Sequence, residues 1–339
     1  MNFSFSEDQL AFRDAVRDLL RGQCTIDGVR SAWTNETGRV DGLWAQLAEQ
    51  GVTTISLPED LGGLGLNELD TILILEEAGR ACAPEPLIEV ISVVLPLLAD
   101  AAQGGSSVAR RLADQAAEGA LILPALDGSG LALYGNQADY LIAEDAGRLL
   151  AIPRDALTLA PEISVDRSRR LYRFTFDASK AEEIASGEEA QTLIARAKER
   201  GALGSAAFLL GLGDSMVKLG VDYAKTRKQF NTPIGAFQAI QHRLVNAWTA
   251  VEFSRPMIYR AAYSLAQGDP DASVHVSMAK IYASDGATRA AREVLQCHGA
   301  IGYTTEYELH LLMKRAWALS GTWGDKREHE VRVEAALLD

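Results

Sequence analysis

Residues 227–238 read RKQFNTPIGAFQ, a polar stretch with one proline and one glycine that separates two long helical patterns. Before it, from Ser186, the chain is rich in Ala and Leu, which favour helices. After it, apolar residues recur at helical spacing and predict one buried stripe, made of Phe237, Ile240, Leu244, Ala247, Trp248 and Val251. Pro256 follows on the same helix and is expected to kink or break it. We therefore expect four long helices, packed as a bundle, from Ser186 onward.

Upstream of the bundle, from about Gly119 to Asp177, short apolar runs alternate with turn signals. Three runs are typical of strands, at residues 121–124, 140–143 and 149–152. A fourth, at residues 171–176, places its aromatic side chains on one face and Arg173 and Thr175 on the other. These patterns predict a small β domain of about 60 residues.

The chain before this β domain has a helical pattern. Ser6-Glu7-Asp8-Gln9 has the form of a capping box, which predicts that a helix begins there. A second helix is expected to end before Gly51, and a third to cover residues 67–80. The helical pattern gives way to short apolar runs near Gly119. The fold class is therefore mainly α with a small β domain. We expect an N-terminal helical domain at residues 1–117, the β domain at 118–185 and the helical bundle at 186–339.

Composition narrows the class of protein. The chain has 33 basic and 46 acidic residues and a formal net charge of -13, which argues against nucleic acid as a partner. It has no run of 18 apolar residues, so no membrane span is expected, and no signal peptide is expected at its start. Cys24, Cys82 and Cys297 are far apart, which indicates reduced thiols in a cytoplasmic protein without a metal site.

Two further motifs accompany residues 227–238. Residues 57–65 read LPEDLGGLG, and residues 296–303 read QCHGAIGY, followed by Thr305-Glu306-Tyr307. The three motifs, in this order and at this spacing, resemble the acyl-CoA dehydrogenase family over essentially the whole chain. The resemblance implies that family's fold of helical domain, β domain and four-helix bundle. It also implies an FAD-dependent desaturation of an acyl-CoA substrate, with an electron-accepting flavoprotein as a further partner.

The resemblance assigns cofactor contacts to residues 227–238. Arg227 would reach the pyrophosphate of the FAD in a neighbouring subunit, a role that suits a planar guanidinium with paired donors. Gln229 and Phe230 would line the same pocket, and Gln238 would meet the flavin nucleotide. The alternative is that Arg227 merely complements the dipole at a solvated helix C-terminus.

The third motif implies further cofactor contacts at Gln296, Gly299, Ala300 and Gly302. The glycines are expected to let the backbone approach a ligand closely, and the Gln296 amide can both donate and accept. The family usually has two glycines where this chain has Gly299-Ala300, so the added methyl group would weaken the adenine-side contact. Residues 57–65 are interpreted as a connector in which glycines permit a tight turn.

The catalytic base of the family has no obvious counterpart. Desaturation needs a carboxylate to remove the proton α to the thioester, and the two positions that hold it in the family fall on Trp323 and Gly201 here. An indole N–H cannot accept a proton. Glu199 and Asp325 are weak catalytic candidates because they lie near these positions in sequence.

The middle domain also lacks the loop and strand with which family members hold their own flavin. The chain therefore resembles the shorter subunit of α2β2 acyl-CoA dehydrogenases, many of which act on steroid side-chain thioesters. We expect it to complete the FAD site of a longer acyl-CoA dehydrogenase subunit. Two alternatives stay open: a self-sufficient homo-oligomer with a relocated carboxylate, and a non-enzymatic scaffold with the same fold.

Overall fold

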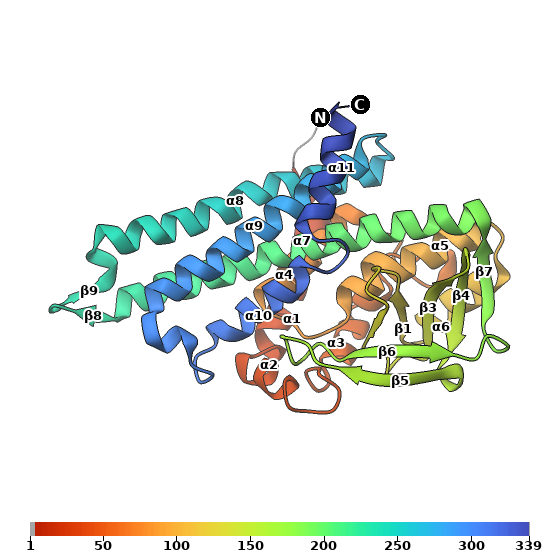
Figure 1. Cartoon of the computed structure of the whole chain (residues 1–339), viewed down its shortest axis with the longest axis horizontal. Coiled ribbons are helices and arrows are strands. Elements are labelled where there is room, and N and C mark those ends of the chain that lie inside the picture. The colour runs from red at the N-terminus through yellow and green to blue at the C-terminus, as the bar shows by residue number, and fades with distance from the viewer. Residues whose placement is uncertain (1–3, 339) are drawn as a thin grey trace. The chain divides into compact units, whose positions relative to one another are not determined.

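The computed structural model describes residues 4–338, which are mainly helical with a small β region (Figure 1). They form two compact units, each assembled from several segments of the chain. Unit 1 comprises Met1–Arg30, Ile72–Ala83 and Ser205–Asp339, and unit 2 comprises Ser31–Thr71 and Pro84–Gly204. The predicted fold class is confirmed, with N-terminal helices, a β region and C-terminal helices following one another along the chain.

Three predicted helix boundaries are close to the observed ones: the start after Ser6, the end before Gly51 and the helix at residues 67–80. The N-terminal helices are α1 (Glu7–Gln23), α2 (Ile26–Ala32), α3 (Leu43–Glu49), the short η1 (Val52–Thr54) and η2 (Glu59–Leu61), α4 (Glu68–Arg80), the π-helical η3 (Ile88–Val94), α5 (Leu95–Gln103) and α6 (Ser107–Ala117). The capping box is confirmed: Ser6 Oγ accepts from the Gln9 amide at 3.1 Å, and Gln9 Oε1 accepts from the Ser6 amide at 2.9 Å. Gly51 follows α3 with φ 76°, a conformation that glycine adopts without strain.

The loop at residues 57–65 is the tight connector that its glycines predict. Gly62 and Gly65 have φ of 79° and 66°. The loop closes on itself because the Gly65 amide donates to the Leu57 carbonyl at 2.8 Å. A Cβ atom at Gly63 would lie 2.1 Å from that same carbonyl oxygen, so only glycine fits there.

The β region consists of two small sheets, both in unit 2. Its strands are β1 (Ile122–Ala125), β2 (Leu131–Leu133), β3 (Tyr140–Asp145), β4 (Arg148–Pro153), β5 (Leu157–Glu162), β6 (Leu171–Phe176) and β7 (Glu182–Ser186), with η4 (Arg154–Ala156) between β4 and β5. One sheet has the order β1-β3-β4-β7 and the other β2-β6-β5. Only β1 and β3 are parallel. On β6, Arg173 and Thr175 are exposed as predicted.

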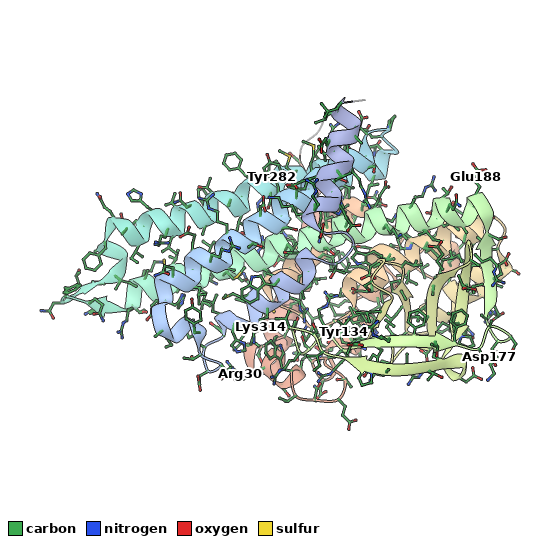
Figure 2. All side chains as sticks on the ribbon, viewed as in Figure 1. Arg30, Tyr134, Asp177, Glu188, Tyr282 and Lys314 are labelled. Carbon is green, nitrogen blue, oxygen red and sulfur yellow. The ribbon has the colours of Figure 1, made fainter. Side chains whose placement is uncertain are left out.

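Tyr134 anchors the chain beside these sheets (Figure 2). It is among the largest fully buried side chains, and its hydroxyl donates to the Pro84 carbonyl at 3.0 Å. A buried phenol needs such an acceptor because an unpaired hydroxyl would cost about 1–3 kcal/mol. This bond ties the segment after β2 to the start of the helical stretch that carries η3.

The C-terminal helices differ from the prediction in length. The elements are α7 (Gly187–Thr226), β8 (Lys228–Gln229), β9 (Thr232–Pro233), η5 (Ile234–Ala236), α8 (Gln238–Gln267), α9 (Ala272–His298), η6 (Gly299–Tyr303), α10 (Leu309–Ser320) and α11 (Lys326–Leu338). Three of these helices are long, with 40, 30 and 27 residues, whereas α10 and α11 have 12 and 13. The expectation of four long helices was therefore wrong for the fourth.

Pro256 does not break α8, which runs through it from Gln238 to Gln267. Packing holds the helix on both sides of Pro256: before it, a Cβ atom at Gly286 of α9 would come within 2.8 Å of the Ala250 carbonyl oxygen, and after it, Ile258 and Ala261 are buried. Contact this close stabilises the helix beyond its local propensity, so tertiary packing overrides the cost of one missing hydrogen bond.

The predicted buried stripe of α8 is only partly buried. Leu244, Ala247 and Val251 are buried, but Trp248 is 53% exposed and Phe237 36% exposed. Trp248 follows Ala247 by one residue, which turns its side chain about 100° away from the buried face. Phe237 precedes the first residue of α8 and serves as its N-cap. The apolar face of α8 is thus narrower than the sequence suggested.

Helix α7 is long and apolar enough to cross a membrane by length and composition alone. Its apolar window is, however, 78% buried inside the protein. Burial of this kind is typical of a core helix in a water-soluble domain, whose apolar surface is covered by neighbouring helices.

Candidate cofactor site

The turn between α7 and α8 projects its side chains outward. Helix α7 ends at Thr226, and the hairpin β8–β9 turns at Phe230 and Asn231, with φ of 52° and 64°. Two consecutive residues with positive φ match the turn whose twist suits a two-residue hairpin. For a bulky residue such as Phe230 this conformation is unusual. It leaves the Phe230 ring 89% exposed at the tip of the hairpin.

The side chains around this hairpin are free to meet a ligand. Arg227, Gln229 and Gln238 are exposed, and the Arg227 guanidinium makes no ion pair within residues 4–338. Phe230 meets Phe237 edge to face, with ring centroids 6.2 Å apart. The hairpin is anchored to the helix end because the Ile234 amide donates to the Arg227 carbonyl at 2.8 Å.

The C-terminus of α9 presents the third motif. Gln296, Gly299 and Ala300 are exposed. Gly299 has φ 64° and ψ −139°, and a Cβ atom there would meet no heavy atom within 4 Å, so its backbone is open to a ligand. Gly302 differs from the expectation. It is buried, and a Cβ atom there would lie 2.8 Å from Leu295 Cδ1, so this glycine serves packing against α9.

An aromatic cluster joins the two motifs. Tyr223, on the last turns of α7, stacks on His298 at the end of α9 with ring centroids 4.3 Å apart. His298 Nδ1 donates to the Val294 carbonyl at 2.8 Å, and its Nε2 accepts from the Tyr307 hydroxyl at 2.9 Å. Burial lowers the pKa of His298 and raises that of Tyr307 to about 12, so both are neutral near pH 7. The cluster therefore fixes the end of α9 against that of α7.

Sequence reasoning placed His298 and Tyr307 in a motif but did not give them this role, and it missed Tyr223 altogether. Figure 1 shows the outcome: the β8–β9 hairpin and the end of α9 lie at the same end of unit 1. All the predicted cofactor residues except Gly302 are exposed there, and they offer one guanidinium, three amides and an aromatic pair. This donor set fits the pyrophosphate and a flat ring of a dinucleotide.

The two positions at which the resemblance predicts a base hold no proton acceptor. Trp323 is buried with φ 60°, and its indole N–H has no hydrogen-bond partner in the part of the chain that the structure describes. Gly201 is buried in α7, two residues after the half-buried Glu199. Asp325 is engaged in capping α11: its Oδ1 accepts from the Glu328 amide at 3.0 Å, and Glu328 Oε2 accepts from the Asp325 amide at 2.9 Å.

Two buried side chains hold the loop around Trp323, and sequence reasoning missed both. The Lys280 ammonium is fully buried and donates to the carbonyls of Leu319 at 2.6 Å and Thr322 at 2.9 Å. His329 Nε2 donates to the Trp323 carbonyl at 3.1 Å. Burial lowers the pKa of His329 to about 4, so the ring is neutral. The sequence offered one indication that Lys280 is buried: it lies among the small residues that form the buried face of α9.

Family models match most of this chain. The model described as "Acyl-CoA dehydrogenase, N-terminal domain" matches residues 6–112, and that described as "Acyl-CoA dehydrogenase, C-terminal domain" matches residues 192–326. The chain is also 30% identical over 339 residues to acyl-CoA dehydrogenase IpdE2 of Mycobacterium tuberculosis, with 98% of each chain covered. The chain belongs to the acyl-CoA dehydrogenase family.

Solved structures of acyl-CoA dehydrogenases share the fold. A variant of the Tcur3481-Tcur3483 steroid ACAD superposes with a TM-score of 0.87 at 23% identity, covering 98% of each chain. The ChsE4-ChsE5 complex of Mycobacterium tuberculosis gives 0.86 at 22%, covering 100% of this chain and 99% of that one. Butyryl-CoA dehydrogenase of Megasphaera elsdenii gives 0.84 at 21%, covering 100% of both. At such identities the likeness shows the fold alone.

Proposed function

We propose that this acyl-CoA dehydrogenase chain is the shorter subunit of an α2β2 enzyme and completes the FAD site of a longer partner subunit. The assembled enzyme would introduce an α,β double bond into an acyl-CoA thioester and pass electrons to a flavoprotein acceptor. The observation that carries the proposal is the contrast between an exposed cofactor end and a base position filled by the buried Trp323.

Each retained residue has a task in that arrangement. Arg227 would bind the pyrophosphate with two parallel hydrogen bonds, because its guanidinium is exposed and unpaired within residues 4–338. Gln229, Gln238 and Gln296 would orient the nucleotide, and the open backbone at Gly299 would let it approach. FAD supplies the hydride acceptor. Removal of the α proton would fall to a carboxylate of the partner subunit, since Trp323 cannot accept it.

The relatives support this reading by their names. The IpdE2 proteins of Mycobacterium tuberculosis and Mycolicibacterium smegmatis, each 30% identical to this chain, are named acyl-CoA dehydrogenases. Two of the structural neighbours are named as a two-component steroid ACAD and as a two-component complex. We therefore propose a steroid-derived acyl-CoA as the substrate. The three cysteines form no disulfide within residues 4–338 and are buried, which favours the reducing cytoplasm.

Purification with and without the partner tests the proposal. The chain alone should retain little FAD and show no acyl-CoA dehydrogenase activity. Co-purified with its longer partner, it should form an α2β2 assembly that holds about two FAD, because a site forms only where the partner's flavin cradle meets this chain's cofactor end. Mass photometry gives the stoichiometry and flavin absorbance the FAD content. Turnover by the chain alone, with one FAD per subunit, would instead support the self-sufficient homo-oligomer.

A further inference from the structure

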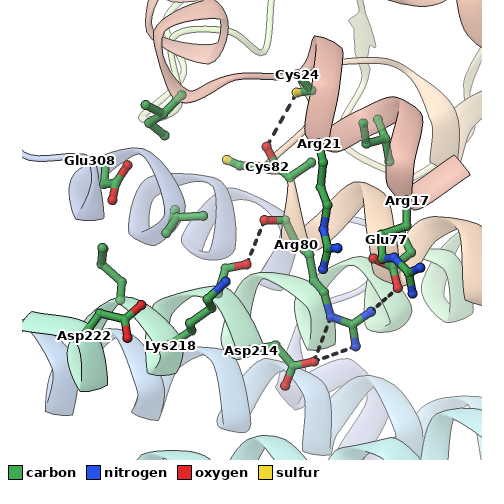
Figure 3. Close-up of a pocket in the computed structure, with 16 residues that line it drawn as sticks. Arg17, Arg21, Cys24, Glu77, Arg80, Cys82, Asp214, Lys218, Asp222 and Glu308 are labelled. Atoms are coloured by element: carbon green, nitrogen blue, oxygen red, sulfur yellow. Dashed lines mark hydrogen bonds and ion pairs between the residues drawn. The ribbon is translucent and has the colours of Figure 1, made fainter. Parts of the chain in front are cut away.

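A half-open cavity of about 590 Å³ lies within unit 1, between α1, the end of α4, the middle of α7 and the start of α10 (Figure 3). It shares no residue with the candidate cofactor site. Its volume lies within the range of small-molecule sites, about 300–1,000 Å³. Leu20, Cys24, Cys82 and Leu312 form an apolar floor and are all buried. The half-open cavity therefore offers an apolar body one wall of leucine and cysteine side chains.

Two cations point into this cavity without a partner. Arg21 extends from the last turn of α1, and Lys218 extends from α7 toward the same space (Figure 3). Neither forms an ion pair or a side-chain hydrogen bond in residues 4–338. Lys218 and Asp222 are four residues apart, a spacing at which opposite charges can pair on a helix, yet Lys218 points away from Asp222 (Figure 3). The chain has a net charge of -13, so acidic residues outnumber basic ones. Two cations that face the same cavity without an ion pair in the described part of the chain are therefore available to an anionic ligand.

The other cations of the cavity are already neutralised. Arg17 pairs with Asp14 at 2.7 Å, and Arg80 pairs with Asp214 at 2.8 Å and with Glu77 at 2.5 Å. These ion pairs lie along the helices that line the cavity, and the positive charge of Arg17 and Arg80 is neutralised by their partners. The anion-binding capacity of the cavity therefore rests on Arg21 and Lys218.

Two carboxylates limit the charge that a ligand can carry. Asp222 and Glu308 line the side of the cavity away from Arg17, Arg21 and Arg80 (Figure 3). They offset the two free cations, so a dianionic head group would meet repulsion at close range. Burial raises the pKa of Glu308, which weakens but does not remove this repulsion. A single negative charge suits the site better than two.

We propose that this cavity binds an amphipathic monoanion, a carboxylate on an apolar body. Arg21 and Lys218 receive the carboxylate at the mouth, and the apolar body lies on the floor of leucine and cysteine side chains. The inference does not depend on the FAD role, because it uses neither the cofactor end nor the partner subunit.

Calorimetric titration of the full chain tests the site with three probes of equal chain length: decanoate, decanol and decyl phosphate. Decanoate should bind saturably at one site. The neutral alcohol and the phosphate should each bind with an affinity at least about 10-fold lower than that of decanoate. Arg21→Gln and Lys218→Gln should each weaken decanoate about 10-fold. Arg327→Gln, an exposed cation of α11 outside the cavity, should leave the affinity unchanged.

Thiol labelling gives a second measurement that needs no variant. Decanoate should slow the modification of Cys24 and Cys82, because both line the cavity. The rate of modification of Cys297, which lies outside the cavity, should not change. Mass spectrometry of the labelled peptides reads out each thiol separately. The proposal fails if decanoate does not saturate, if decanol or decyl phosphate binds as tightly, or if both glutamine variants bind decanoate like the parent chain.

Discussion

At the scale of single residues, the local surroundings of a side chain decide which chemistry it can supply. Arg227 stands at the end of α7, exposed and without an ion pair among residues 4–338, so its charge is available to a phosphate. Trp323 stands where the resemblance to the family predicts the base, and it is buried with its carbonyl bound to His329. One residue is thus presented to a ligand, while the other is built into the core.

Arg227→Ala should weaken FAD retention in the assembled enzyme and leave the fold intact. Loss of a charge-assisted pair of hydrogen bonds should cost on the order of 2–4 kcal/mol of binding, or roughly 30- to 800-fold in affinity. Lys228→Ala is the matched control, because Lys228 is an exposed neighbour on the same hairpin. Flavin fluorescence across a dilution series measures the retention. Equal FAD occupancy in the Arg227 and Lys228 variants would refute the assignment of Arg227.

His329 should make stability depend on pH between about 6.5 and 4. Burial lowers its pKa to about 4 in the folded chain, whereas an unfolded histidine titrates near 6.5. The unfolded state therefore takes up a proton first as pH falls, and up to about 3 kcal/mol of stability, present above pH 6.5, is lost on the way to pH 4.

His329→Gln should flatten this part of the profile, since glutamine does not titrate. It should also cost about 1 kcal/mol at pH 8, through the weakened hydrogen bond to the Trp323 carbonyl. Urea unfolding midpoints at pH 8 and pH 5 measure both effects. A variant that loses as much stability as the parent chain between these pH values would show that other groups carry the dependence.

At the scale of elements, side chains from neighbouring helices satisfy the helix ends. The C-terminus of α10 is closed by Lys280 of α9, which donates to the carbonyl of Leu319 in the last turn of α10 and to that of Thr322 just after the helix. A cation at this end also complements the negative pole of the helix. The C-terminus of α9 is held by His298 and Tyr307 in the aromatic cluster with Tyr223. The end of α9 precedes the loop of the third motif, and the end of α10 precedes the loop that carries Trp323.

Lys280→Met should destabilise the chain by about 2–4 kcal/mol. Methionine fills most of the volume but leaves the Leu319 and Thr322 carbonyls without their donor in a buried place. Lys326→Met is the control, because Lys326 pairs with Asp285 at 2.7 Å on the surface, where an ion pair contributes about 0–1 kcal/mol. Chemical unfolding of the two variants side by side gives the comparison. Losses of equal size would mean that Lys280 does not cap α10.

At the scale of the whole molecule, we propose that this chain supplies part of an active site and a partner subunit supplies the rest. The cofactor end of this chain is exposed, its two family positions for a base hold Trp323 and Gly201, and Asp325 is engaged in capping α11. An acyl-CoA dehydrogenase needs both a flavin and a carboxylate at one site. The proposed partner would supply what this chain lacks, and the two chains together would make one complete site per pair.

The double variant Glu199→Gln with Asp325→Asn should leave turnover of the assembled enzyme within about threefold of the parent. Glutamine and asparagine keep the shape of each side chain, and asparagine still caps a helix, so the fold should persist. Loss of a true base would instead cost about 10²–10⁴-fold. Steady-state desaturation with an artificial electron acceptor provides the rate. A fall of that size would show that this chain carries the base.

The sequence alone was enough for the family, the fold class and the boundaries of several helices and strands. Local signals suffice there: a capping box at Ser6, a left-handed glycine at Gly51 and alternating polarity at residues 171–176 act within a few residues of themselves. The motif residues around Arg227 and Gln296 were instead assigned by resemblance to the family, and their roles toward FAD stay predictions. The sequence also predicts that this chain lacks the base, because a tryptophan cannot replace a carboxylate, and this too stays a prediction.

Tertiary structure alone decided which apolar residues of α8 are buried, whether Pro256 breaks that helix, and how Lys280, His329 and Tyr223 are used. Each depends on atoms far away in the chain, such as the carbonyls of α10 or the close approach of α9. Periodicity shows that a helix has an apolar face, but the width of the buried part is set by the neighbour that covers it. A buried lysine is stable only where the fold brings acceptors to it, and no local pattern reports that.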